Sequence, residues 1–454
     1  MNALLSILAL VLCISILVIM PLLLPPEFTA FYGSFTIFDS AKALILCAFL
    51  SGGVALILSQ VKVDGVFLVR LFIGALLFRM FIAAFIFGMN VQGYFGADAF
   101  TYDTLGISLI KAWEGSLYDA GLILRFTGAG LTGSGWGMIY VVGTVYSVIG
   151  RNMFAVQMVN AVVGALTAPI VFLIALRLFG NHKVARTAAL AVAFFPSLAL
   201  WSAQGLKDGP IMFLLALSMF ATLKLGEKFD PVFVVVLICS LFGLLSLRFY
   251  VFYIAAAAIG MAFVFGTKAM SAQTVLRQLV VVLLLGGAFS YLGISKFANA
   301  QIEAYGNLDY VERVRSDLSR SADSGYGKDL NVSTTEGALT AVPVGLVYLL
   351  FAPFPWQMGS FRSMITFPEM IVWWSSFPFL ILGIWYALRF RLRQCAPILV
   401  FVSMLTVAYS VFQGNVGTAY RQRSQVLVFY LIFVSVGYHL YKEKREDRRA
   451  AKIK

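Results

Sequence analysis

Long apolar runs constrain the fold of this chain more than any other feature. Six lie in the first half, at about residues 3–24, 42–60, 66–89, 153–179, 188–202 and 209–225. Six more follow, at about 231–247, 249–267, 279–294, 370–388, 396–413 and 425–441. An α-helix of about 20 apolar residues crosses the hydrocarbon core of a bilayer. The sequence therefore predicts an all-α integral membrane protein with about twelve transmembrane helices.

Composition supports a membrane location. Of the 454 residues, 61% are hydrophobic and 12% are charged, which is too few polar side chains to cover a water-soluble globule of this size. The net charge of +13 could suggest nucleic acid, but much of it lies beside apolar runs, as in the tail at 442–454. Such a distribution is typical of membrane topology. We therefore expect a lipid bilayer, and no nucleic acid, as the partner.

Basic residues also predict the orientation. The short basic connections all fall in the cytoplasm if both termini lie there. They contain Lys183, Arg186, Lys224, Lys228, Lys268, Arg277, Arg389, Arg391 and Arg393. The same alternation places the segments 90–152, 203–208, 295–369 and 414–424 outside the cytoplasmic membrane. An enzyme with its active face there, away from soluble nucleotides, needs a donor carried by the membrane.

This topology divides the chain into four predicted parts. Residues 1–294 form a bundle that includes an acidic catalytic loop at 90–152. Residues 295–369 form an exported loop or lid with a re-entrant segment, 370–441 form the C-terminal membrane helices, and 442–454 form a basic cytoplasmic tail. The runs at about 137–149 and 342–354 are too short to span, so we interpret them as interfacial or re-entrant.

The first exported segment carries the strongest catalytic candidate, Asp98, in GYFGADAFTYD. From Tyr102 onward, apolar residues recur at helical spacing, which predicts an interfacial helix. Asp98 and Asp103 lie near its start, and Tyr102 and Asp103 can contact a sugar or a metal. Asp98 can act as a general base toward an acceptor hydroxyl. The alternative role is a helix cap, and the two are compatible.

The motif WSAQGLKDGPI places Lys207 and Asp208 at an exported turn, where charges need partners or water. Lys207 can contact a lipid phosphate, and Asp208 can bind sugar hydroxyls or a metal. The structural alternative is a helix cap beside a snorkelling lysine. Arg248, at another exported junction, is either a phosphate ligand or an interfacial anchor.

Two arginines, Arg421 and Arg423, precede the last apolar run on the side where arginine is disfavoured. Guanidinium groups bind phosphate oxygens bidentately, so a lipid phosphate or diphosphate is the expected ligand. Pairing with loop acids is the alternative. Trp356 and Arg362, which follow the hydrophilic stretch 295–340, can contact a sugar or headgroup, although an aromatic belt also explains them.

Several chemistries are excluded on the exported face. The only histidines, His182 and His439, lie at predicted cytoplasmic positions, so a His-based zinc site or serine triad is not expected there. We find no phosphate-binding or dinucleotide-binding glycine motif. The sequence indicates no specific cofactor, but Asp98, Asp103 and Asp208 can supply oxygen ligands to Mg²⁺ or Mn²⁺ if their loops meet, so a divalent cation stays open.

Four stretches together resemble the GT-C class of membrane glycosyltransferases, in particular protein mannosyltransferases and lipid A aminoarabinose transferases. They are GADAFTYD, YVVGTVYSVIGRNMFAVQMVNAVVGALTAPIVFLIALRLFG, AALAVAFFPSLALWSAQGLKD and YRQR. The resemblance implies transfer of a sugar from a polyprenyl-phosphate carrier to an extracytoplasmic acceptor, such as an envelope glycan, lipid or protein. It also implies that Asp98 is the base and that Arg421, Arg423, Lys207 and Arg248 hold the lipid phosphate.

The chain departs from the resemblance in three ways, and two other functions stay open. It has extra helices before the acidic loop, a lone Asp98 where many relatives carry two adjacent acids, and a modest exported domain. A polysaccharide polymerase or ligase would use polyprenyl-diphosphate-linked glycans and rely on its arginines, with Asp98 dispensable. A lipid or glycan transporter or flippase would use intramembrane charges, such as Arg70 and Arg79.

Overall fold

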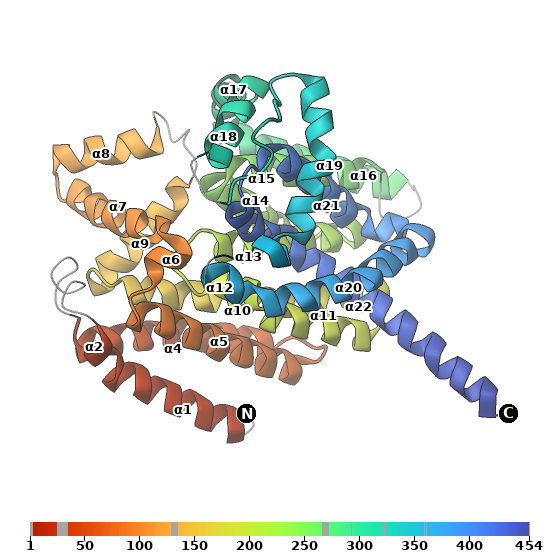
Figure 1. Cartoon of the computed structure of the whole chain (residues 1–454), viewed down its shortest axis with the longest axis horizontal. Coiled ribbons are helices and arrows are strands. Elements are labelled where there is room, and N and C mark those ends of the chain that lie inside the picture. Colours follow the sequence, from red (N-terminus) through yellow and green to blue (C-terminus); the bar gives the residue numbers. More distant parts are fainter. Residues whose placement is uncertain are drawn as a thin grey trace. The chain divides into compact units, whose positions relative to one another are not determined.

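A computed structural model describes residues 3–24, 35–128, 135–265, 272–291, 293–320, 324–357, 359 and 361–453. Within these ranges every regular element is a helix, and Gly325 and Asn415 form an isolated β-bridge (Figure 1). The chain packs into two units. Unit 1 comprises residues 1–170 and 189–213, and unit 2 comprises 171–188 and 214–454. This division crosses the predicted segment boundaries, so the four-part division by membrane topology stays a prediction.

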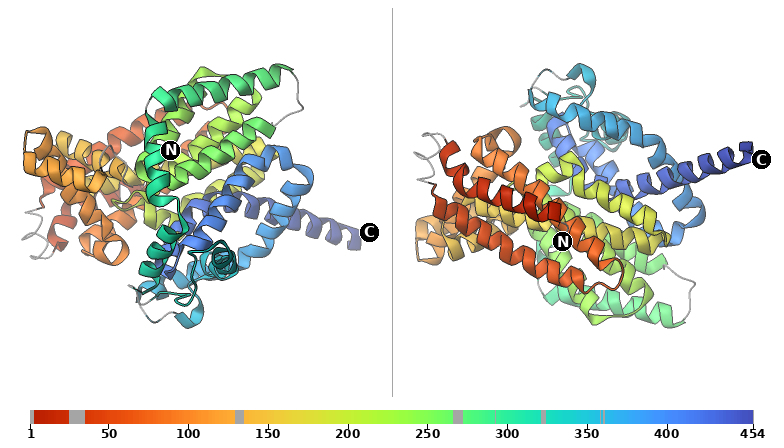
Figure 2. Two further views of the ribbon diagram at one scale, coloured as in Figure 1. Left: turned by 90° about the horizontal axis from the view of Figure 1, so that it is seen from above. Right: turned by 90° about the horizontal axis from the view of Figure 1, so that it is seen from below.

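Unit 1 contains the helices around the acidic loop. They are α1 (Ala3–Val18), α2 (Met20–Leu23), α4 (Ile37–Ser59), α5 (Gly65–Gly88), α6 (Gln92–Gly96), α7 (Asp98–Trp113), α8 (Leu117–Thr127), α9 (Trp136–Ile149) and α12 (Pro196–Ser202). Three helices belong to both units: α10 (Met153–Phe179), α11 (His182–Phe194) and α13 (Asp208–Glu227). Helices α1, α4 and α5 lie side by side, as Figure 2 shows from below.

Unit 2 contains the remaining helices. They are α14 (Pro231–Leu247), α15 (Phe249–Phe265), α16 (Ala272–Tyr291), α17 (Ile294–Tyr305), α18 (Leu308–Arg320), α19 (Thr335–Phe351), η1 (Pro355–Gln357), α20 (Phe361–Phe390), α21 (Leu392–Phe412) and α22 (Val416–Ile453). Helix α22 packs along α20 and continues through the basic tail to residue 453, and the side chains of residues 442–449 are exposed.

Over their described residues, all twelve predicted runs lie mainly in helices, but not all of these helices have an apolar part long enough to span. Among the described residues, seven qualify by length and apolar character, namely α4, α5, α10, α13, α20, α21 and α22. An eighth qualifies if α11 and α12, which meet at a 54° bend, form one span. The other four predicted runs lie in α1, α14, α15 and α16, whose apolar parts are shorter. The structure thus gives seven or eight candidate spans, and twelve is not shown.

Helix starts follow local capping signals. Thr36 and Asp39 form a capping box before α4, in which the Thr36 backbone N–H donates to the Asp39 carboxylate at 2.9 Å. Ser116 accepts from the Asp119 N–H at the start of α8, and Asp230 caps α14. Each side chain satisfies a backbone N–H that has no partner within its helix.

The break between α11 and α12 is the main irregularity within a predicted span. Pro196 has no N–H and occupies the first turn of α12, so the α11 ladder ends before it. Buried Arg79 of α5 donates to the Ala193 carbonyl at 2.8 Å and to Ser202 Oγ at 2.8 Å. Arg79 is therefore paired inside unit 1, where it stabilises the broken helix. The candidate re-entrant geometry lies here, whereas α9 and α19, predicted to be re-entrant or interfacial, are continuous helices.

The predicted interfacial helix exists as α7, but its apolar face is covered by another helix. Leu105 and Leu109 are buried, and α7 packs closely against α9. A Cβ atom placed on Gly106 would lie 2.4 Å from Val142 Cγ1, so only glycine permits this approach. The 3.6-residue pattern predicted the helix correctly, while the partner of its apolar face was not predictable from spacing alone.

The hydrophilic stretch 295–340 is largely helical and tied to unit 2. It forms α17, α18 and the start of α19, with residues 321–323 outside the described part. Buried Arg315 donates to the carbonyls of Gly327 and Leu330 at 3.0 and 3.1 Å. The Tyr326 N–H donates to the Gly414 carbonyl at 2.8 Å. A lid motion of this segment stays a prediction.

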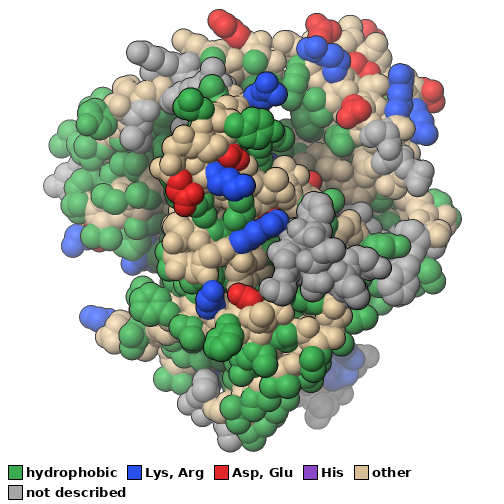
Figure 3. All heavy atoms as spheres, turned by 90° about the vertical axis from the view of Figure 1, so that its left-hand side faces the viewer, with side chains coloured by type: hydrophobic (Ala, Val, Ile, Leu, Met, Phe, Trp, Pro, Cys, Tyr) green, Lys and Arg blue, Asp and Glu red, His purple; other side chains and the backbone are tan. Residues whose placement is uncertain are grey.

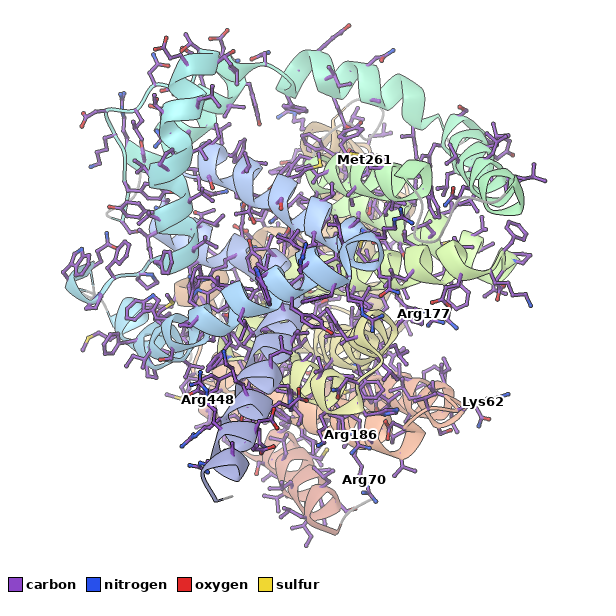
Figure 4. All side chains as sticks on the ribbon, turned by 90° about the vertical axis from the view of Figure 1, so that its right-hand side faces the viewer. Lys62, Arg70, Arg177, Arg186, Met261 and Arg448 are labelled. Atoms are coloured by element: carbon purple, nitrogen blue, oxygen red, sulfur yellow. The ribbon has the colours of Figure 1, made fainter. Side chains whose placement is uncertain are left out.

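Basic side chains and the acidic loop lie at opposite ends of α5 within unit 1. Lys62 and Arg70 are near its beginning (Figure 4), and Asp98 follows its end. The 24 residues of α5 extend for about 36 Å, which is enough to cross a bilayer. The face in Figure 3 carries hydrophobic side chains together with several Lys, Arg, Asp and Glu side chains. Which end faces the cytoplasm stays a prediction.

Candidate functional site

The acidic loop and the Lys207–Asp208 turn meet in unit 1. Gly96, two residues before Asp98, lies against the turn. A Cβ atom placed on Gly96 would lie 2.6 Å from Leu206 Cδ1 and 2.9 Å from Gln204 Oε1. A larger residue at position 96 would therefore force the side chains of Leu206 and Gln204 to shift. The chain thus brings two sequence-predicted segments together, although about a hundred residues separate them.

A network of buried amides holds this junction. Gln92 Nε2 donates to the Gly96 carbonyl and to Gln204 Oε1, both at 2.8 Å. Gln157 Nε2 donates to Gln92 Oε1 at 2.9 Å, and Asn160 donates to the backbone carbonyls of residues 204 and 206. Buried polar networks of this kind fix one arrangement, because any displacement leaves desolvated groups unpaired. The four amides belong to Gln92, Gln157, Asn160 and Gln204, all buried.

Two predicted contacts, Tyr102 and Lys207, converge beside Gly135, the residue before α9. A Cβ atom on Gly135 would lie 3.1 Å from Lys207 Nζ and 3.2 Å from Tyr102 Oη. The ammonium and the phenol hydroxyl therefore border the same backbone position. Tyr102 is buried and Lys207 is half-buried, so the site combines a fixed hydroxyl with a partly accessible cation.

Asp98 is the first residue of α7, and its side chain is exposed. Ala97 occupies the N-cap position, and Asp98 lies in the first turn of the helix. A carboxylate in the first turn interacts favourably with the helix dipole, so the structural alternative for Asp98 stays open. An exposed carboxylate at this position can accept a proton from a bound hydroxyl compound.

Asp103 has a different environment. It is 1% exposed, and both carboxylate oxygens accept from Arg151, Nε at 3.2 Å and Nη2 in a closer contact. Tyr146 donates to the same carboxylate. This group ties α7 to the turn between α9 and α10. The predicted role of Asp103 as a sugar or metal ligand disagrees with this geometry, because both oxygens already accept from partners within the fold.

The three acids predicted as metal ligands do not assemble. Across the part of the chain that the structure describes, no three or more His, Cys, Asp or Glu side chains come together in a way that could hold a metal ion. Asp98 is exposed, Asp103 pairs with Arg151, and Asp208 is buried at the start of α13. These residues therefore do not fit a shared Mg²⁺ or Mn²⁺ site, and we route no chemistry through one.

Arg423, in unit 2, is engaged with the backbone. It is 1% exposed, and its Nη1 donates to the carbonyls of Leu350 and Ala352, each at 3.1 Å. Its guanidinium carbon lies 4.9 Å from the centre of the Tyr420 ring. Because the last carbonyls of α19 have no partner within that helix, Arg423 satisfies them. The predicted role of Arg423 as a lipid-phosphate ligand disagrees with this position.

The other predicted ligands in unit 2 are less constrained. Arg421 is half-buried at the start of α22. Buried Arg248 lies at the α14–α15 junction, 5.8 Å from the Tyr250 ring centre, in agreement with an anchor among aromatic residues. Trp356 is 79% exposed and stacks on Phe354. Arg362 lies in α20, but its side chain is outside the described part. Ligand roles for these four residues stay predictions.

Sequence reasoning missed the amide network and Arg151. A usable signal was present for two of these residues. Gln157 and Asn160 are three positions apart inside the apolar run 153–179, so they share a helix face, and polar residues in such a run need partners. Gln92 and Gln204 lie at the ends of runs, where an amide is unremarkable. Only the fold brings the four together.

Comparison with known proteins places part of this region in a recognised family. Residues 136–291 match the model of the dolichyl-phosphate-mannose-protein mannosyltransferases. The matched segment contains Gln157, Asn160, Lys207, Asp208 and Arg248 and begins after Asp98. A comparison with curated proteins found no match.

Proposed function

We propose that Asp98 is the catalytic base of this chain. The chain is a membrane glycosyltransferase similar to the dolichyl-phosphate-mannose-protein mannosyltransferases. It is of the GT-C class and uses a polyprenyl-phosphate sugar donor. The acceptor is a hydroxyl or amine compound of the cell envelope, whether glycan, lipid or protein. The observation that carries this proposal is the junction of the Asp98 loop with the Lys207–Asp208 turn through Gly96 and Gln204.

In the proposed reaction, Asp98 takes the proton of the acceptor hydroxyl as the acceptor oxygen attacks the anomeric carbon of the donor sugar. The bond between that carbon and the phosphate oxygen breaks, and the lipid phosphate leaves with the bonding electron pair. Lys207 stabilises the negative charge that develops on the phosphate. Tyr102, beside Lys207, can donate to the phosphate or to the sugar.

The proposal also includes the number of membrane crossings and their orientation. The four shorter apolar helices, in α1, α14, α15 and α16, complete twelve membrane crossings, with both termini in the cytoplasm. The active face is then extracytoplasmic. The position of the acidic loop and of Lys62 at opposite ends of α5 supports this orientation, because basic connections favour the cytoplasmic side.

A donor panel tests the proposal. Purified protein in proteoliposomes is given labelled sugar on a polyprenyl monophosphate, a polyprenyl diphosphate or a nucleotide, with envelope extract as acceptor. We expect transfer from the monophosphate only. Transfer restricted to diphosphate-linked glycans would replace the proposal with the polymerase or ligase function. Movement of lipid between leaflets without transfer from any donor would indicate a flippase.

A further inference from the structure

An apolar groove runs between the first helices and α5 in unit 1. It has a volume of about 620 Å³, within the range of roughly 300–1,000 Å³ that ligand pockets occupy. One wall includes Leu12, Ile16 and Met20, and the other includes Leu77, Phe81 and Phe85. Among the described residues that line it, none is charged and Ser15 alone is polar. Such a groove binds hydrocarbon and cannot hold a phosphate.

The groove points toward the acidic loop. It follows α5 from Gly74 to Phe85, a length of about 17 Å. Leu23 lines it and also lies against Gly88, the last residue of α5, since a Cβ atom on that glycine would lie 3.6 Å from the Leu23 side chain. Four residues after Gly88, Gln92 begins the amide network that holds the Asp98 loop.

The groove also opens outward. Phe81 and Phe85 are both more than half exposed although they line it. They lie on the same stripe of α5 as Phe78, at positions i, i+3 and i+7. Because α5 is a candidate membrane span, an open side of this kind faces lipid. A single chain can enter it laterally from the bilayer.

We infer that the α1–α5 groove holds the polyprenyl chain of the donor next to its phosphate. This inference rests on the proposed function, which places the phosphate near Lys207 in the same unit. Free acyl chains of bilayer lipids are as apolar as the groove, so contact alone does not select an occupant. A chain tethered by its headgroup at the acidic loop has a higher local concentration than untethered chains.

Chain-length dependence tests the inference. Ala84 lines the groove, and Ala84→Trp would fill it. The matched control is Ile45→Trp on α4, at a position that is 69% exposed and outside the groove. We expect Ala84→Trp to raise KM for a full-length polyprenyl donor about tenfold, which corresponds to lost contact for about two methylene groups. KM for a donor with a truncated chain should not change, and Ile45→Trp should affect neither donor.

A second readout does not depend on turnover. A polyprenyl phosphate with a photoreactive group along its chain is irradiated in proteoliposomes, and the labelled peptides are identified. We expect labelling of α1 and α5 that unlabelled polyprenyl phosphate displaces. Labelling elsewhere, labelling displaced equally by phospholipid, or cross-linking of two protein copies through α1 would overturn the inference. Equal effects of Ala84→Trp on long and short donors would also overturn it, while transfer by the wild type would leave the proposed function intact.

Discussion

Asp98 in unit 1 and Arg423 in unit 2 attract attention in the sequence for the same reason, since each is a charge at a predicted exported end of an apolar run. Their environments differ. Asp98 is exposed at the start of α7, two residues after a junction held by buried amides, whereas Arg423 is buried and donates to two backbone carbonyls. An unusual charge at a helix end shows that a charge is needed there. Its neighbours decide whether it acts on a ligand or on the fold.

Substitution of Asp98 should have the largest effect, a loss of turnover. Asp98→Asn removes the proton acceptor and keeps the shape, so turnover should fall by about 10²–10⁴-fold, the usual range for general-base catalysis. Turnover is measured as labelled sugar transferred per folded molecule. The matched control is Glu114→Gln at the exposed C-cap of the same helix, which should behave as wild type. Wild-type turnover in Asp98→Asn would show that another group takes the proton.

Arg423 should affect stability instead. Arg423→Met removes the side-chain donor to the Ala352 carbonyl and leaves the Leu350 carbonyl with Trp373 Nε1, at a cost of roughly 1–3 kcal/mol for the buried Ala352 carbonyl. Thermal unfolding in detergent should shift to lower temperature, with little change in KM for the donor. Arg389→Met, at an exposed end of α20, is the control. Unchanged stability with weakened donor binding would restore the phosphate role.

Lys207 should affect donor binding. Lys207→Met removes a charge-assisted hydrogen bond, and KM for the lipid-linked donor should rise by about 10–100-fold. Lys207→Arg should recover part of the affinity, and Lys111→Met, at an exposed position of α7, should not alter it. The structural alternative, a snorkelling lysine, predicts instead that Lys207→Met changes stability and leaves KM as it was.

Substitutions in the amide network should have the smallest effect on stability and kcat. Gln204→Leu leaves Gln92 Nε2 with one acceptor fewer, so stability should fall by about 1–2 kcal/mol. If the network positions Asp98, kcat should also fall, by about tenfold, with KM nearly constant. Gln60→Leu, exposed at the end of α4, is the control. Loss of stability without any change in kcat would limit the network to a structural role.

The sequence predicted the helices well because length and apolar character are local properties. All twelve runs are mainly helical over their described residues, and the acidic loop, the Lys207 turn and the arginine pair were identified as unusual charges. The roles of Asp103 and Arg423 were not predictable, because they depend on partners distant in the chain, Arg151 for the first and the end of α19 for the second. Pro196 is a visible cause of the helix break in the sequence. The hydrogen bond from Arg79 to the Ala193 carbonyl at this break has no such signal.

The proposed mechanism places the chemistry in the acidic loop. Its sharpest test compares turnover per folded molecule of Asp98→Asn and Arg423→Met with the monophosphate donor. We predict that Asp98→Asn is folded and nearly inactive, while Arg423→Met yields less folded protein that works at close to the wild-type rate. The reverse result, an active Asp98→Asn and a well-folded but inactive Arg423→Met, would contradict the account and move the reaction to the arginines of unit 2.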